Sequence, residues 1–468
     1  MLTTVGVPGK AIEALRALLP GGVDTDEATR AAMSTDRSGT RGDGIAEAVL
    51  HPRTTAQVQE ICRVASRYGI PVVPRGAGTG LAGGAVAGHG QLVLCTDRMT
   101  DILEISVENQ LAVVQPGILN GDLNRVLAEH GLWWPPDPAS KAISTVGGNI
   151  AMNAGGLLCA KYGVTREAVL ALTVVLADGE VIHVGHRTVK GVAGLDLCAL
   201  MIGSEGTLGI ITECTVKLRP VVTGAVPTIG AYFHDAAAAA GAASMVTAAG
   251  ERPAIMELMD GNMLRAVADY SGADLTTGGG AYLLVQTDGP DADGEAGRIA
   301  GILRGAGALS LQLTTDPDAA ESLVDVRRSG FLAIEARGSV LVEDVAVPRD
   351  RIADMYRHID DVADRYGLFI ATPCHAGDGN LHPTIVIEPG QTVMPDRVWD
   401  AAGEIFEAAL ALGGTLSGEH GIGLLKKRWL GTELGDRQLE LQRGIAALFD
   451  PAGIMNPGKV FPAQLPAR

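Results

Sequence analysis

The sequence predicts an α+β protein with two main domains, and three features of the chain predict it. Short β-rich segments alternate with helical ones, and Asp178-Gly179 joins two such segments with the dipeptide typical of a hairpin turn. Glycine is concentrated in three dense stretches of the first half. Near residue 225 the texture changes to alanine-rich helical stretches that alternate with strands, which is typical of a second domain.

The helix over residues 55–68 is the best-defined element of the first domain. Thr54 or Thr55 can cap its start, and Gly69 ends it. The strand over 70–73 follows directly. The other elements that we expect before Pro220 are helices over 10–19 and 119–130 and strands over 92–95, 102–106, 111–115, 168–176, 180–184 and 210–218.

The second domain is expected to continue the mixture of helices and strands. Its strands are predicted over residues 282–287, 340–347, 368–371 and 384–387. Two helices are predicted near the end of the chain, over 398–412 and 437–449. We find no internal repeat and no low-complexity linker.

Composition and charge exclude several classes of protein. With 47% hydrophobic and 19% charged residues, the chain can bury a large core. Its net charge of −17 argues against nucleic acid and against docking on an anionic membrane. None of the six cysteines has C-x-x-C spacing, which argues against iron–sulfur and structural zinc motifs. Since we see no signal peptide and no apolar run of roughly 20 residues, we expect a cytoplasmic protein.

The first glycine-dense stretch carries a dinucleotide-like pattern, Gly78-x-Gly80-x-x-Gly83. A Rossmann site needs a helix straight after these glycines, and residues 83–90 are too rich in glycine to form one. A Rossmann NAD site is therefore disfavoured. Backbone N–H groups of such a loop can still point together at phosphate oxygens. The alternative is a plain structural turn, but five glycines within 76–84 are more than a turn needs.

The second stretch, residues 144–156, is also rich in glycine and small residues, like the first. Its small side chains and asparagine amides suit a polar ligand that lies flat against the backbone. The two stretches are about 70 residues apart in the chain. Together they suggest an extended dinucleotide that is held at several points.

The segment Pro373–Pro383 carries two histidines, His375 and His382, on either side of the turn-forming core 377–380. A hairpin would make the two histidines cross-strand neighbours. Neutral imidazoles so placed are good ligands for zinc or another divalent metal. For the histidine pair alone, two separate structural histidines would be the better interpretation.

A third element, Ser417-Gly418-Glu419-His420-Gly421-Ile422-Gly423, favours the metal site. Glu419 can add an oxygen ligand, giving two imidazoles and one carboxylate with open positions for substrate. His420 is then free to act as a base. Glycines on both sides permit the sharp bend that two adjacent roles need.

The motifs Pro74–Gly80, 147–156 and Gly203–Ile210 resemble the FAD-binding domain of the vanillyl-alcohol oxidase and p-cresol methylhydroxylase superfamily. The resemblance implies a two-subdomain FAD-binding domain over 1–220, an α+β cap domain with an antiparallel sheet over 221–420, and a C-terminal segment, 421–468, that returns to the flavin. It implies non-covalent FAD, because residues 74–84 contain no histidine and His89 lies beyond them. The implied FAD contacts are Pro74, Arg75, Gly76, Ala77, Gly78, Thr79, Gly80, Ser144, Gly148, Asn149, Ile210 and Asn456.

The two histidine-containing motifs are similar to those of a subgroup: flavin-type D-lactate dehydrogenases, the catalytic subunit of glycolate oxidase, and D-2-hydroxyglutarate dehydrogenase. The resemblance implies that His420 is the catalytic base and that Asn380 lies near the substrate. Arg327 matches the position that binds the substrate carboxylate, and Arg328 stays open as the true match. The implied metal ligands are His375, His382 and Glu419, with zinc as the first expectation and manganese or iron as alternatives.

The resemblance implies oxidation of a small D-2-hydroxy acid to the 2-keto acid, with hydride passing to flavin N5. We expect D-lactate or glycolate, because relatives that prefer 2-hydroxyglutarate can carry a lysine in the strand that is here Val340–Asp344, which has no basic residue. The alternatives are a D-2-hydroxyglutarate dehydrogenase and an FAD subunit active only within a larger glycolate oxidase-type complex. A metal-dependent hydrolase would leave the glycine-dense stretches unexplained.

Electrons must leave the flavin for an external acceptor. The sequence does not choose among a quinone, a cytochrome, electron-transfer flavoprotein and an iron–sulfur partner subunit. Peripheral association with a membrane through such a partner is the alternative to a purely cytoplasmic location. We expect no nucleic acid and no transmembrane segment, and the sequence leaves a homodimer open.

Overall fold

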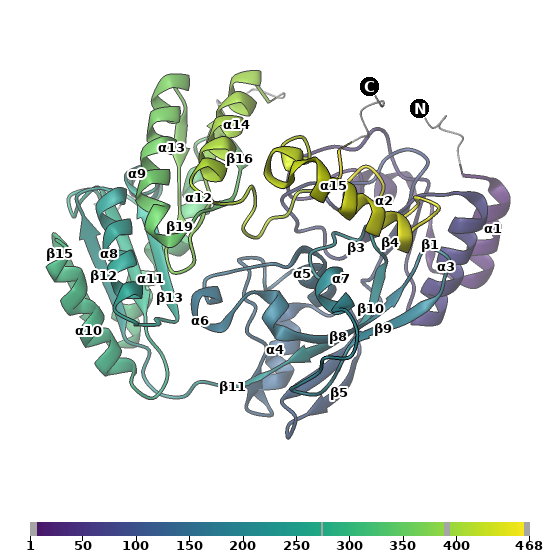
Figure 1. The fold of residues 1–468 in the computed structure, drawn as a ribbon, viewed down its shortest axis with the longest axis horizontal. Coiled ribbons are helices and arrows are strands. Elements are labelled where there is room, and N and C mark those ends of the chain that lie inside the picture. Colours follow the sequence, from purple (N-terminus) through teal and green to yellow (C-terminus); the bar gives the residue numbers. More distant parts are fainter. Residues whose placement is uncertain (1–6, 273–274, 388–393, 463–468) are drawn as a thin grey trace. The chain divides into compact units, whose positions relative to one another are not determined.

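The computed structural model describes residues 7–272, 275–387 and 394–462, and it confirms the α+β class (Figure 1). The chain forms two compact units. The first comprises Met1–Gly155, Gly163–Val221 and His420–Arg468, and the second comprises Gly156–Tyr162 and Val222–Glu419. Residues 156–162 therefore pack with the second unit, although their place in the sequence is within the stretch that we assigned to the FAD-binding domain.

The first unit holds a four-stranded sheet of order β1-β2-β4-β3 and a five-stranded antiparallel sheet of order β5-β6-β10-β8-β9. In the four-stranded sheet, β2 and β3 run parallel to β4. The strands are β1 (Val23–Asp24), β2 (Ala48–Leu50), β3 (Val72–Arg75), β4 (Leu92–Cys95), β5 (Ile102–Ser106), β6 (Leu111–Val114), β8 (Val169–Val175), β9 (Val181–Gly185) and β10 (Ile210–Lys217), with a separate pair β7 (Leu132–Trp133) and β11 (Arg219–Pro220).

Eight helices of the first unit pack around these sheets. They are α1 (Gly9–Leu18), α2 (Glu27–Ala32), α3 (Thr55–Tyr68), α4 (Asn120–Ala128), α5 (Val146–Met152), the short 3₁₀ helix Thr165–Ala168, α7 (Leu197–Met201) and α15 (Leu430–Phe449) among the described residues. Figure 1 shows α1 and α3 side by side, in agreement with their contact.

Helix α3 forms as local sequence predicts. The Thr54 hydroxyl accepts a hydrogen bond from the Gln57 amide, and Gly69 ends the helix with φ +62°. The apolar positions Val58, Ile61 and Ala65 recur at helical spacing, so one face of α3 is buried. Helix α3 packs on β8 and β10, and the first glycine-dense stretch begins at the end of β3.

The second unit is built on a seven-stranded sheet of order β15-β12-β14-β13-β19-β20-β17, in which the pairings with a recorded register are antiparallel. A three-stranded sheet, β16-β21-β18, lies in the same unit. The strands are β12 (Thr228–Phe233), β13 (Ile255–Asp260), β14 (Ala281–Gln286), β15 (Ser310–Thr314), β16 (Ser339–Val342), β17 (Val345–Ala346), β18 (Phe369–Ala371), β19 (Cys374–His375), β20 (Asn380–Leu381) and β21 (Thr384–Ile387).

Helices cover the large sheet. Helix α8 packs on β12, β13 and β14 and against α13, and Figure 1 shows α8 and α10 together on this sheet. Tyr282 and Leu284 of β14 share a buried cluster with residues of α9, α11 and α12. The helices are α6 (Cys159–Tyr162), α8 (Ala236–Ala248), α9 (Gly261–Ser271), α10 (Ala292–Gly305), α11 (Pro317–Arg328), α12 (Gly330–Glu335), α13 (Ile352–Tyr366) and α14 (Asp396–Ala411).

The structure corrects three of the predicted elements. The strand expected over 340–347 is two strands in different sheets, because the buried Glu343 and Asp344 interrupt it. The second glycine-dense stretch contains a helix, α5, which Thr145 caps by accepting from the Gly148 amide. Helix α15 begins seven residues earlier than predicted, and Gly435, with φ 69° and ψ 165°, kinks it.

Among the described residues, every helix is too short or too polar to span a lipid bilayer.

Candidate functional site

The two histidines of the 373–383 segment lie close together, but they are not direct cross-strand partners. In the β19–β20 hairpin His375 pairs with Asn380, because the turn is two residues shorter than a His375–His382 pair would require. His382 follows Asn380 by two residues, and it therefore points to the same face of the hairpin. The two imidazole rings are 5.0 Å apart between centroids, at an angle of 83°.

Glu419 faces both imidazoles. Its Oε1 lies 3.4 Å from Nε2 of His375 and 3.1 Å from Nε2 of His382. Burial raises the pKa of the Glu419 carboxyl, but the two histidines outweigh it and hold that pKa well below its ordinary value. Two imidazole nitrogens and one carboxylate oxygen within 4.8 Å of one another form a donor set that suits a catalytic zinc ion.

Glu257 on β13 contacts His375 at Nδ1, whereas Glu419 faces Nε2 of the same ring. The sequence alone did not predict a role for Glu257. Its carboxylate is completely buried. Oε1 lies 2.6 Å from Nδ1 of His375, and Oε2 accepts from Nε of Arg327 at 2.9 Å. Burial raises the pKa of Glu257, but His375 and Arg327 hold it below the ordinary value. A glutamate between the apolar residues Met256 and Leu258 was the available signal, because buried carboxylates are almost always paired.

Asp344, which the sequence analysis also missed, holds the loop that carries Glu419. Its carboxylate accepts from the amides of Gly418 and Glu419 at 2.6 and 2.7 Å, and from the Ser417 hydroxyl. A Cβ on Gly418 would lie 2.5 Å from the side-chain amide of Asn380, so the loop closes on Asn380 only because residue 418 is glycine. Asn380 Oδ1 is buried and has no hydrogen-bond partner within the described residues, which suits contact with a polar ligand.

The structure separates the two candidate arginines of α11. Arg327 is 17% exposed in its side chain and bonds to Glu257, whereas Arg328 is 61% exposed and pairs with Glu321. Only Arg327 therefore connects to the cluster that contains His375.

In the first unit, the glycine-rich motifs lie against one another. A Cβ on Gly76 would lie 2.3 Å from Oγ1 of Thr145, and a Cβ on Gly206 would lie 3.0 Å from the Pro74 ring. The C-terminal motif joins them, because Nδ2 of Asn456 donates to the carbonyls of Gly84 and Glu205. Motifs that are far apart in the sequence thus lie together in one glycine-rich region of the first unit.

This region fits a polar cofactor such as FAD. The hydroxyl of Ser144, Nδ2 of Asn149 and Oδ1 of Asn456 are buried, with no hydrogen-bond partner in the part of the chain that the structure describes. Buried polar atoms are rarely left so, and a ligand would satisfy them. The guanidinium of Arg75 donates to the carbonyls of Thr35 and Ala85 and so holds the loop, which leaves the backbone amides of the loop as the groups that would contact FAD.

The remaining predicted FAD contacts lie along the same motifs. Pro74 ends β3 together with Arg75, and Ile210 is the buried first residue of β10. Gly148 belongs to α5, and the loop after β3 contains Gly76, Ala77, Gly78, Thr79 and Gly80. No helix follows this loop before residue 92, as the rejection of a Rossmann site requires.

Glu205 fixes the loop that follows His420. Its Oε1 accepts from the Ile422 amide at 2.7 Å and its Oε2 from the Gly423 amide at 2.8 Å. Gly421 has φ +85°, and a Cβ there would lie 2.5 Å from the methyl group of Met152. Burial raises the pKa of Glu205 to about 7, although the two amides and nearby lysines lower it in part. The sequence alone predicts no role for Glu205.

Glu205 should make stability depend on pH. Its carboxyl ionises near 4.5 in the unfolded chain and near 7 in the native one, so the native protein binds more protons between these values. Stability should fall by ~3 kcal/mol as pH rises through this window. Glu205→Gln should flatten this part of the profile of unfolding midpoint against pH. Glu60→Gln, at an exposed position of α3, should leave it unchanged, and an unaltered profile in Glu205→Gln would contradict the assignment.

A second group of metal-ligating residue types, His51, Cys95 and Asp97, is less suited to an ion. Nδ1 of His51 already lies 2.8 Å from Asp97. Burial raises the pKa of the Cys95 thiol to about 12, so the thiolate that a metal needs is disfavoured. Arg75, which pairs in register with Cys95, adds a positive charge.

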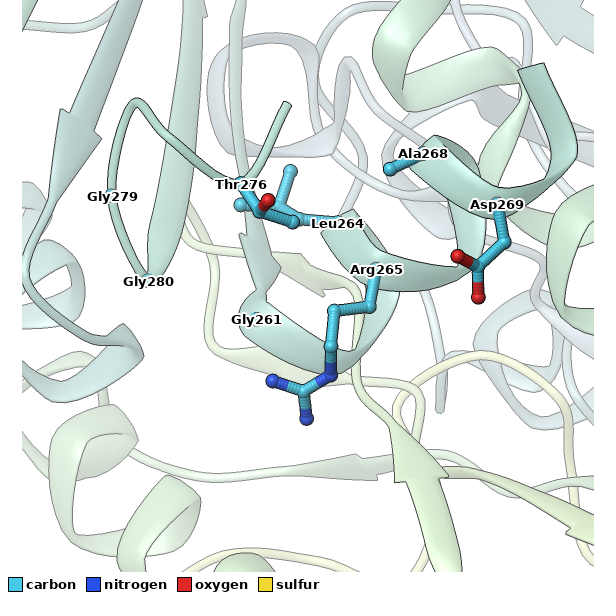
Figure 2. A pocket seen from close by; sticks show the side chains of 8 residues that line it. All are labelled: Gly261, Leu264, Arg265, Ala268, Asp269, Thr276, Gly279 and Gly280. Atoms are coloured by element: carbon cyan, nitrogen blue, oxygen red, sulfur yellow. The ribbon is translucent and has the colours of Figure 1, made fainter. Parts of the chain in front are cut away.

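The hollow drawn in Figure 2 lies elsewhere in the second unit. It is lined by residues of α9 and of the segment before β14, and Arg265 and Asp269 project from the same helix there. None of the predicted site residues is among those that line it.

The chain matches two known families of domains. Residues 46–185 match the FAD binding domain, and residues 224–460 match the C-terminal domain of FAD linked oxidases. The chain is 41% identical over 445 residues to the glycolate oxidase subunit GlcD of Bacillus subtilis, covering 94% of each chain. It is 37% identical over 414 residues to a D-lactate dehydrogenase of Archaeoglobus fulgidus, covering 88% of this chain and 90% of the relative.

A solved structure of p-cresol methylhydroxylase with substrate bound shares the fold. The TM-score is 0.79 and the alignment covers 96% of each chain, at 18% sequence identity. This likeness concerns the fold alone.

Proposed function

Because the chain belongs to the FAD-linked oxidases, we propose that it oxidises a small D-2-hydroxy acid to the 2-keto acid with non-covalently bound FAD and a divalent cation. The observation that carries the proposal is the convergence of His375, His382 and Glu419, the last of which is followed directly by His420. The names of the relatives, a glycolate oxidase subunit and a D-lactate dehydrogenase, support this class of substrate.

The two groups that the chain would hold supply what amino acids cannot. FAD, when bound, accepts a hydride at N5. His375, His382 and Glu419 would hold a divalent ion, which would supply Lewis-acid polarisation of the substrate hydroxyl and so a lower pKa of that hydroxyl.

Side chains of the protein supply the base and the contacts that bind the substrate. His420 takes the proton from the hydroxyl, as general-base catalysis requires, while the hydride leaves C2. Arg327 pairs with the substrate carboxylate, for which its planar fork is suited. Asn380 contributes polar contacts from the β19–β20 hairpin. The reaction leaves the 2-keto acid and a protonated His420, and FAD would supply the two-electron acceptor, to be reoxidised by an external acceptor.

We favour D-lactate or glycolate over 2-hydroxyglutarate. A second substrate carboxylate needs a second basic side chain in the site. Relatives that prefer 2-hydroxyglutarate can carry a lysine in the strand that is here β16, and β16 has no basic residue. Turnover of D-lactate, glycolate and D-2-hydroxyglutarate with a dye acceptor tests this preference. A clear preference for the dicarboxylate would overturn it.

A second candidate is an FAD subunit that acts only within a larger complex. It is favoured by the 41% identity to a protein that is named as a subunit. Purified alone, such a chain would be yellow but would turn over slowly with every acceptor. Substrate would still bleach the flavin in a single turnover, which distinguishes this candidate from a failure of the proposed chemistry.

One preparation tests the cofactors. The absorbance spectrum should show oxidised flavin, and elemental analysis should find about one divalent ion per chain. Denaturation should release all of the FAD, because residues 74–84 contain no histidine, and His89 pairs instead with Glu47. Flavin fluorescence that stayed with the denatured chain would refute non-covalent binding, and a colourless protein would refute the proposal as a whole.

The two arginines of α11 provide a matched pair. Arg327→Met should raise KM for the hydroxy acid by about 10²-fold, because the charge-assisted pair with the carboxylate is lost. Arg328→Met should leave KM within about twofold, since Arg328 pairs with Glu321 at the exposed surface. The reverse pattern in steady-state kinetics would assign the carboxylate to Arg328.

A further inference from the structure

We propose that Glu257 is a positioning residue that orients both the metal ligand His375 and the carboxylate-binding Arg327. This inference rests on the proposed function. The three residues come from different elements, β13, β19 and α11. One carboxylate thus joins the group that would hold the cation to the group that would hold the substrate.

The contact with His375 selects a tautomer. Nδ1 of His375 lies 2.6 Å from Glu257 Oε1, while Nε2 faces Glu419 and His382. When Nδ1 carries the proton and donates it to Glu257, the Nε2 lone pair is directed to the site of the cation. A carboxylate behind a ligating imidazole also makes that imidazole a better ligand.

The contact with Arg327 directs the guanidinium. The bond to Glu257 uses Nε, so the two terminal nitrogens stay available for a planar, two-point contact with a carboxylate. A flexible arginine would have to be ordered each time substrate bound, and the Glu257 bond removes part of that cost.

The pairing of both carboxylate oxygens, and not burial, favours the charged form of Glu257. Its side chain is fully buried, a position that a carboxylate occupies only when its oxygens are paired. Both oxygens are used, one for each partner.

The rival explanation is a buried ion pair that serves stability alone. Asp260 gives a matched control on the same strand. Its carboxylate is also buried, and it accepts from the amides of Met263 and Thr372. Loss of this carboxylate should affect folding at this strand without removing a direct contact to His375 or Arg327.

The test compares Glu257→Gln with Asp260→Asn in FAD-loaded protein that has been stripped of metal. Zinc affinity is measured by competition with a chromogenic chelator, and KM for the preferred hydroxy acid is measured after zinc is restored. Glu257→Gln should weaken zinc binding by about 10- to 100-fold and raise KM. Asp260→Asn should keep both values within about threefold of the parent, whatever its melting temperature.

Three results would overturn the inference. Unchanged zinc affinity and KM in Glu257→Gln would show that the carboxylate does not position either group. Equal losses in Glu257→Gln and Asp260→Asn would show a general effect of the strand. If Glu257→Gln does not fold, Glu257→Asp serves in its place, because it keeps the charge but has a shorter side chain. Zinc affinity equal to that of the parent in Glu257→Asp would also contradict the inference.

Failure of the proposed function has a separate signature. If the parent protein itself binds no zinc, manganese or iron at His375, His382 and Glu419, the metal proposal and this inference fall together. If the parent binds metal and Glu257→Gln binds it equally well, only the inference falls.

Discussion

Replacing His420 with alanine should leave FAD bound and slow the reduction of the flavin by substrate by about 10²- to 10⁴-fold. The hydroxyl proton has to leave as the hydride departs, and alanine offers no acceptor for it. Rapid mixing of the yellow enzyme with excess D-lactate or glycolate, followed by flavin absorbance, measures this step directly. Metal content should be unchanged, because the ligands of the proposed site are His375, His382 and Glu419.

His89→Ala gives the control for this experiment. His89 is half-exposed and pairs with Glu47, so its loss should leave the rate of reduction unaltered. If substrate bleached His420→Ala at the parental rate, His420 would not be the base. Loss of FAD from His420→Ala would point instead to a role for this residue in folding the loop that Glu205 holds.

Removal of the metal should have an effect of similar size. Stripping the protein with a chelator, or replacing His382 with alanine, should lower turnover by at least about 10³-fold, because the Lewis acid that activates the hydroxyl contributes several kcal/mol. Zinc should restore the stripped parent but not His382→Ala. Adding manganese or iron to the stripped parent would show which ion supports turnover best.

The contrary result is equally clear. Full activity in stripped protein, with no metal detected, would mean that the two histidines are structural and that their contacts with Glu257 and Glu419 serve the fold. The flavin chemistry would then depend on His420 and Arg327 without a cation.

Local signals determined much of the fold. The cap at Thr54, the left-handed Gly69 and the apolar spacing between them depend on neighbouring residues only, so α3 was predicted to within one residue. The β8–β9 hairpin was predicted in the same way, because Asp178-Gly179 favours a tight turn and Gly179 adopts φ +83°. The strand expected over 340–347 was wrong, because its division depends on Asp344 bonding to residues that are about 70 positions away.

The same distinction between local and long-range signals holds for the candidate site. The motifs around His375 and Glu419 were recognisable because their residue types are rare in such spacing. The close approach of the two histidines was expected, but their register was not, since a turn that is two residues shorter changes every cross-strand pair. Glu257, Asp344 and Glu205 were missed because nothing near them in the chain marks their partners.

The sequence by itself therefore determined the residue types that do chemistry, the family of the chain and the elements that short-range contacts stabilise. Only the tertiary structure decided which buried carboxylate supports which group, and which of Arg327 and Arg328 faces the cluster. The physical reason is that a buried charge must find its partner across the fold. That partner is chosen by the packing of strands and helices that are distant in sequence.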